Sequence, residues 1–281
     1  MNIEEFQDIK YQKDDETGIV TVTLATPKRK NAMSFLTFLE LWYATDMVEK
    51  DDTAQAMLIT GAKDPDESDP SKEAFSSGGF FSPTFLKTVP PQTQAEIDFT
   101  DIAQKRLTLK MWKCEKPIVA AINGLAIGAG FTLPLACADF IFMSEHAYVR
   151  LPFVRLGILP EFSSAYLLPR LIGFQRAKEI CYLGKTLSAK EVYDLGLINA
   201  VLPHGELLPH AKKIIMELIP PGGPILAIKL TKRAMHKPLI ESITKSLDIE
   251  NEGLNKAILT HDFMEAGAAR KEKRKPVYKG A

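Results

Sequence analysis

The sequence predicts an α/β fold with a helical C-terminal extension. Short segments rich in apolar and β-branched residues, such as 18–25 and 56–61, alternate with amphipathic stretches that are typical of helices. Beyond Pro203 only helices are expected, over residues 206–219, 222–236 and 239–266. Alternating strands and helices indicate a mostly parallel sheet covered by helices. We therefore expect an α/β core over residues 1–205 and a helical region over residues 206–281.

Local signals support the individual elements of this core. Ser34 is placed to cap a helix that runs from Phe35 to about Lys50, and Ser188 opens a capping box with Glu191. The polar, proline-containing segment 62–73 predicts a surface loop. Further strands are expected at 117–122, 140–143 and 147–150, further helices at 100–113, 130–136 and 163–172, and irregular structure at 81–100.

Composition excludes several classes of protein. The 281 residues are 46% hydrophobic and 25% charged, which is ordinary for a globular chain and unlike a disordered or collagen-like one. Lys+Arg and Asp+Glu both number 35, so a nucleic acid is not expected as the main partner. The three cysteines form no CxxC pair, and the apolar stretch 118–137 is interrupted by glycine and proline. With no secretory signal at the N-terminus, we expect a cytoplasmic protein without a membrane segment.

Two glycine-rich segments share one design. The first Gly-rich turn is residues 74–79, Ala-Phe-Ser-Ser-Gly-Gly, and the second Gly-rich turn is residues 123–130, Asn-Gly-Leu-Ala-Ile-Gly-Ala-Gly. Small residues leave backbone N–H groups accessible, and a following helix adds partial positive charge. Two such N–H groups aimed at one point would form an oxyanion hole. The alternative is that these glycines only allow tight turns and close packing.

Residues 117–139 closely resemble the signature of the enoyl-CoA hydratase/isomerase (crotonase) superfamily. The resemblance extends over nearly the whole chain, from about residue 16 to the end. Its further matches are residues 27–33, 75–79, 156–161, 168–173, 189–203 and 272–278. The resemblance implies a crotonase-like spiral core of ββα units, a helical C-terminal trimerisation region and acyl-CoA thioesters as ligands. It also implies a homotrimer or a dimer of trimers.

The resemblance assigns the oxyanion hole to the N–H groups of Gly79 and Ala129. These would hold the carbonyl oxygen of a thioester enolate. No cofactor is expected, because coenzyme A is part of the substrate, and the five scattered histidines show no spacing typical of a metal site. Phe80 replaces the acidic residue that the family carries after this glycine.

One carboxylate distinguishes the branches of the superfamily. Hydratases of the family use two carboxylates around one water, and the matching positions here are Thr132 and Phe153, which cannot exchange protons as a carboxylate does. Segment 151–166 instead resembles peroxisomal-type 3,2-enoyl-CoA isomerases, and this places Glu161 as the single acid and base. The alternative for Glu161 is a solvated carboxylate that stabilises the next helix N-terminus. Phe162 departs from the family's glycine at the next position.

The remaining residues are expected to bind substrate. Lys28 and Arg29 lie in a basic turn that could meet the CoA phosphates or could equally be a solvated loop, and Ala32 is expected beside the adenine. The other expected lining residues are Phe75, Ser77, Gly78, Gly128, Thr132, Phe153 and Phe162. Aromatic residues that could line an acyl tunnel, or simply belong to the core, also include Phe80, Phe81, Phe85 and Tyr166.

These features predict an enzyme that moves the double bond of an enoyl-CoA from the 3,4 to the 2,3 position. Two alternatives remain open. One is another reaction of the same enolate: hydration, thioester hydrolysis or C–C bond cleavage. The other is a non-catalytic acyl-CoA-binding protein that kept the fold.

Overall fold

The computed structural model describes residues 1–80 and 89–281. Within them, one sheet has the strand order β1-β2-β3-β5-β7-β10 and a smaller sheet has the order β4-β6-β8-β9. The larger sheet consists of β1 (Ile9–Lys13), β2 (Ile19–Leu24), β3 (Ala56–Gly61), β5 (Ile118–Ile122), β7 (Phe140–Ser144) and β10 (Ala200–Leu202). The smaller sheet consists of β4 (Ala74–Ser76), β6 (Leu125–Ile127), β8 (Tyr148–Arg150) and β9 (Thr186–Ser188).

Consecutive strands alternate between the two sheets. β3, β5 and β7 lie in the larger sheet, and β4, β6 and β8, which follow them in sequence, lie in the smaller one. Among the strands of residues 1–80 and 89–281, the pairs β1–β2 and β8–β9 are antiparallel and the other pairs are parallel. Helices connect one strand pair to the next, which gives the repeated ββα order. The predicted α/β fold is therefore confirmed.

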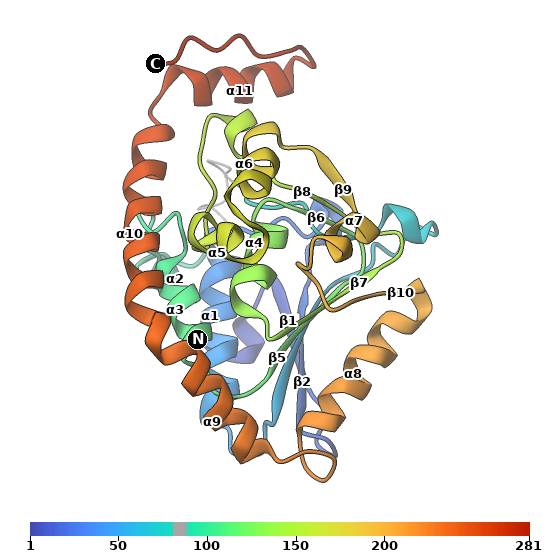
Figure 1. Ribbon diagram of the computed structural model, residues 1–281. Helices are drawn as coiled ribbons and strands as arrows, with labels where there is room; N and C mark the ends of the chain where they lie inside the picture. Colours follow the sequence, from blue (N-terminus) through green and yellow to red (C-terminus); the bar gives the residue numbers. More distant parts are fainter. Residues whose placement is uncertain (81–88) are drawn as a thin grey trace.

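Helices cover both faces of the larger sheet (Figure 1). The α-helices of the described residues are α1 (Phe35–Lys50), α2 (Pro91–Gln94), α3 (Lys105–Lys113), α4 (Ala129–Cys137), α5 (Ser164–Ile172), α6 (Phe174–Leu183), α7 (Ala189–Asp194), α8 (Leu207–Leu218), α9 (Ile225–His236), α10 (Ile240–Ala257) and α11 (His261–Lys271). In β2, Val20 and Val22 face the central apolar cluster between sheet and helices, and Ile19 faces a second cluster under α8. This follows from the two-residue period of a strand.

Two expected helices have different bounds. The helix expected over 239–266 is divided into α10 and α11, because the Thr260 side chain accepts the Phe263 N–H at 3.2 Å and starts a new helix. The helix expected from residue 100 begins at Lys105. There the Asp101 carboxylate accepts the N–H groups of Lys105 and Arg106 at 2.7 and 2.9 Å, so the preceding residues serve as its cap.

Several elements of the structure were not expected from the sequence, among them strand β1 and helix α6. Phe81 and Phe85, two of the aromatic residues suggested for an acyl tunnel, lie outside the described residues. No helix of the described residues is both long and apolar enough to cross a membrane.

Candidate active site

The small sheet brings the two Gly-rich turns together. β4 and β6 are parallel neighbours, so the residues that follow them, Gly79 and Ala129, emerge at the same edge. A Cβ atom built on Gly78 would lie 2.6 Å from the Ile127 carbonyl oxygen and 3.8 Å from the Ala129 nitrogen. The φ angle of Gly78, +92°, is also one that other residues rarely adopt. The two turns are thus in contact, and glycine at position 78 allows it.

The two N–H groups assigned to the oxyanion hole have no acceptor within residues 1–80 and 89–281. The N–H groups directly before them are bonded: that of Gly78 donates to Ser76 Oγ at 3.1 Å and that of Gly128 to the Arg150 carbonyl at 2.9 Å. Ala129 is the first residue of α4, where a backbone N–H has no partner within the helix. The first turn of α4 also adds partial positive charge. The arrangement leaves both donors free for a ligand oxygen.

Glu161 lies in the turn before α5 and is only 6% exposed. Within the described chain its carboxyl group has no hydrogen-bond donor and no cationic partner. Burial, together with the charge of Glu250, raises the pKa of Glu161 to about 8. The side chain is therefore not a solvated carboxylate, and it can exchange a proton near neutral pH.

The comparisons with known proteins show the family of the chain. The model of the enoyl-CoA hydratase/isomerase family matches residues 14–281. The chain belongs to the enoyl-CoA hydratase/isomerase family. The expected membership of the crotonase superfamily is therefore confirmed, and the chain is a crotonase-type acyl-CoA enzyme.

Three relatives illustrate the range of the family. The chain is 31% identical to a crotonyl-CoA hydratase of Syntrophomonas wolfei, over 96% of this chain and 97% of that one. It is 28% identical to a 1,2-epoxyphenylacetyl-CoA isomerase of Escherichia coli, over 94% and 96%. The structure of an enoyl-CoA hydratase/isomerase from Pseudoalteromonas atlantica superposes with a TM-score of 0.80 at 26% identity, covering 97% of this chain and 100% of that chain. The narrower resemblance to peroxisomal-type 3,2-enoyl-CoA isomerases stays a prediction.

The positions that match the hydratase carboxylates of the family are apolar or already bonded. Thr132 is fully buried, and its hydroxyl donates to the Gly128 carbonyl at 3.3 Å. Phe153 is 3% exposed, and its ring lies 3.5 Å from where a Cβ on Gly128 would be. A phenyl ring, not an acid, therefore borders the second Gly-rich turn.

Two other expected lining residues belong to the central apolar cluster. Phe75 and Phe162 are both fully buried there. The Phe162 ring packs edge-to-face on Phe38, with 5.7 Å between ring centroids. Phe162 thus packs the turn that carries Glu161 against the core.

The basic turn is joined to the first Gly-rich turn. Ser77 donates its N–H to the Lys30 carbonyl at 2.9 Å and its hydroxyl to the Arg29 carbonyl at 3.1 Å. The Arg29 guanidinium pairs with Asp8 at 2.9 Å and lies 4.6 Å from the centre of the Phe80 ring. Ala32, three residues after Arg29, is 7% exposed. These contacts place the turn expected to bind CoA directly beside Gly79.

Lys28 is more exposed than Arg29 and faces acidic residues. Its ammonium group pairs with Asp64 at 2.9 Å and also with Asp66, both in the loop expected over 62–73. A phosphate group that bound Lys28 would have to compete with these carboxylates. Within the described residues, no cluster of histidine, cysteine or carboxylate side chains is suited to hold a metal ion.

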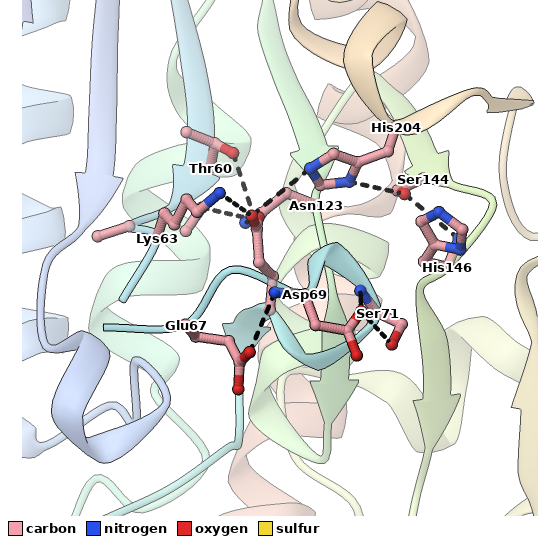
Figure 2. A network of polar contacts seen from close by, with 12 residues as sticks. Thr60, Lys63, Glu67, Asp69, Ser71, Asn123, Ser144, His146 and His204 are labelled. Carbon is pink, nitrogen blue, oxygen red and sulfur yellow. Dashed lines mark hydrogen bonds and ion pairs between the residues drawn. The ribbon is translucent and has the colours of Figure 1, made fainter. Parts of the chain in front are cut away.

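Strand β4 is anchored by a buried polar network, which the sequence did not predict (Figure 2). Glu73, directly before β4, is 6% exposed and accepts the Asn123 side-chain amide at 3.0 Å. Its other oxygen lies 3.5 Å from the Lys63 ammonium and 3.6 Å from His204 Nε2. His204 Nδ1 in turn lies 3.1 Å from the Ser144 hydroxyl. The network joins the first Gly-rich turn to the second and to the start of the C-terminal region.

Glu73→Ala is expected to destabilise the protein by about 2 kcal/mol, because the Asn123 amide would be left buried without an acceptor. Urea unfolding measures the change. Glu179→Ala is the control, because Glu179 pairs with Lys185 while its side chain is 57% exposed. Equal effects of the two substitutions would show that the network does not stabilise the fold.

Proposed function

We propose that the protein is an enoyl-CoA isomerase that moves a double bond from the 3,4 to the 2,3 position. The observation that carries the proposal is the buried, unpaired carboxyl group of Glu161, combined with Thr132 and Phe153 at the two hydratase positions. One carboxylate and two backbone donors are sufficient for this reaction. No cofactor is required, since coenzyme A belongs to the substrate.

The proposed reaction transfers one proton twice. The Glu161 carboxylate removes a proton from C2, which is acidic because it lies between the thioester and the double bond. The electron pair of the broken C–H bond moves to the thioester oxygen, which accepts hydrogen bonds from Gly79 and Ala129. Glu161 then returns the proton to C4, and the double bond forms between C2 and C3. Atoms and electrons balance without a further reactant.

The environment of each group suits its step. A carboxyl with a pKa of about 8 is a stronger base than an ordinary glutamate, and about a tenth of it is still ionised at pH 7. The N–H donors contribute where negative charge develops, and loss of one such donor costs about 2.7–4 kcal/mol in other enzymes.

Hydration is the second candidate, favoured by the names of relatives such as the crotonyl-CoA hydratase of Syntrophomonas wolfei. A second carboxylate near Glu161 is present in Glu250. However, both Glu250 oxygens accept backbone N–H groups, at 2.7 and 3.1 Å. A carboxylate held in this way is poorly suited to activate a water molecule, which favours isomerisation.

Mass spectrometry separates the two candidates. We expect a 3-enoyl-CoA to be converted to the 2-enoyl isomer without a change of mass in ordinary water. A 2-enoyl-CoA should gain no water. Formation of a hydroxyacyl-CoA from either substrate would contradict the isomerase assignment, and free acid would indicate a thioester hydrolase. Binding without turnover across a panel of acyl-CoAs would indicate a non-catalytic protein.

We also propose that the protein acts as a homotrimer or a dimer of trimers. Several apolar side chains of the C-terminal helices are exposed in the single chain, which supports burial by other subunits. They include Leu226 at 69%, Met235 at 66% and Met264 at 61%. Light scattering during gel filtration tests the proposal, and a monomer at micromolar concentration would contradict it.

A further inference from the structure

A second buried carboxylate lies behind the turn that carries Glu161. Glu250, in the middle of α10, is 1% exposed. Its two oxygens accept the N–H of Ser163 at 2.7 Å and the N–H of Ala165 at 3.1 Å. Ser163 is the residue before α5 and Ala165 is its second residue, and neither N–H has a partner within the helix itself. Glu250 therefore reaches across from the C-terminal region to fix the residues directly after Glu161.

The backbone held by Glu250 is a strained one. Phe162 and Ser163 have φ angles of +58° and +57°, two consecutive non-glycine residues in the left-handed region. Each such residue costs about 1 kcal/mol or more and persists only where surrounding contacts impose it. The strain is located between the proposed catalytic side chain and the helix that follows it. Contacts that maintain this backbone therefore also determine where the Glu161 side chain points.

Helix α10 holds the same turn by a second route. Asn251 Oδ1, one residue after Glu250, accepts the Ala103 N–H at 2.7 Å. The Ala103 carbonyl accepts the Phe162 N–H at 3.3 Å. Two adjacent residues of α10 thus control both the Phe162 and the Ser163 ends of the strained turn.

The carboxyl groups of Glu161 and Glu250 differ in the hydrogen bonds that stabilise a negative charge. The titratable groups that influence one another here are Glu161, Glu250 and, on α6, Cys181. Burial raises the pKa of Glu250 to about 8, although its two N–H bonds act to lower it. Glu161 has no hydrogen bonds to its carboxyl group within the described residues, so the negative charge is favoured on Glu250 and the proton on Glu161.

We infer that Glu250 is a positioning residue for Glu161: it imposes the strained turn through two backbone hydrogen bonds and sets a buried negative charge behind the proposed acid and base. The inference rests on the proposed role of Glu161. A simple helix cap would stabilise α5 without altering the protonation of Glu161. In the inferred role, Glu250 both stabilises α5 and alters the protonation of Glu161.

Glu250→Gln tests the inference in the full-length protein, because an amide keeps the size of the side chain and removes the charge. The protonation of Glu161 is followed by infrared titration of buried carboxyl groups and identified by the band that Glu161→Gln removes. We expect this band to titrate about one pH unit lower in Glu250→Gln than in the wild type. The acidic limb of kcat/KM should move in the same direction, since less repulsion opposes ionisation of Glu161.

The matched control is Glu252→Gln, on the same helix but 68% exposed and paired with Lys256. It should leave the band and the pH profile unchanged. An unchanged Glu161 titration in Glu250→Gln overturns the inference, even if the variant is less stable. If Glu250→Gln does not fold, the wild type decides: a Glu161 band that titrates in a single step overturns the inference, and a band that titrates in two coupled steps supports it.

The infrared result is independent of the reaction catalysed. A shifted Glu161 band in Glu250→Gln, together with hydratase or hydrolase products from the wild type, would leave the coupling in place and reject the proposed isomerase function. Isomerase activity that requires Glu161, with no shift in the band, would retain the function and reject the coupling.

Discussion

Glu161→Gln is expected to lower kcat for double-bond migration by about 10³-fold, because an amide cannot accept the C2 proton. Binding of acyl-CoA should change little, since the backbone donors at Gly79 and Ala129 are unaffected. Turnover of a 3-enoyl-CoA, followed by the absorbance of the conjugated product, measures the first effect. Calorimetric titration with a saturated acyl-CoA measures the second. Near-wild-type turnover in the variant would reject Glu161 as the acid and base.

The same variant should be more stable than the wild type at alkaline pH. The folded-state pKa of Glu161, about 8, lies above the ordinary glutamate value of 4.5. The native protein therefore binds a proton that the unfolded chain releases, and stability decreases as pH rises from about 4.5 to about 8. At about 1.4 kcal/mol for each pKa unit, removal of the charge should stabilise the fold by about 4 kcal/mol at pH 8 and by little at pH 4.5.

Urea unfolding at several pH values measures this gain. Glu252→Gln, which removes an exposed carboxylate, should show no comparable pH-dependent gain. A variant that is inactive and yet more stable would show that Glu161 is retained for chemistry. A variant that is inactive and less stable would show that the carboxylate supports the fold.

Gly130→Ala is expected to destabilise the protein by about 3 kcal/mol and to abolish turnover. A Cβ at this position in α4 would lie 2.4 Å from the Ser76 carbonyl oxygen and 3.0 Å from Ser76 Cβ. Neither atom is the end of a flexible side chain, so β4 would have to move, and Gly79 would move with it. Thermal unfolding and turnover measure the two effects.

Gly267→Ala is the matched control, because Gly267 also lies in a helix, α11, and a Cβ there meets no atom within 4 Å. Alanine is the better helix former, so this variant should gain about 0.5–1 kcal/mol. If Gly130→Ala retains both stability and turnover, the close contact between α4 and β4 does not determine the geometry of the oxyanion donors.

Local patterns predicted much of the fold. The Ser34 cap, the apolar strand 118–122 and the capping box at Ser188 depend on neighbours in sequence, and the structure has each of them. The division after Ala257 was missed because the apolar period continues through it, and only Thr260 signals a new helix. Glu73 and Glu250 were missed for another reason: their partners, such as His204 and Ser163, are 131 and 87 residues away. No sequence window contains both members of such a pair.

The parallel pairing of β4 and β6 has a consequence for how this chemistry can diversify. Neighbouring strands lie about 4.8 Å apart, so the sheet, and not a side chain, brings together the ends of β4 and β6 from which Gly79 and Ala129 follow. Under the proposed function, a change at a closely packed glycine such as Gly130 would move these donors, whereas most other side-chain substitutions would leave them in place. Under the proposed function, replacement of Glu161 would redirect the fate of a common intermediate while the two donors that stabilise it remain.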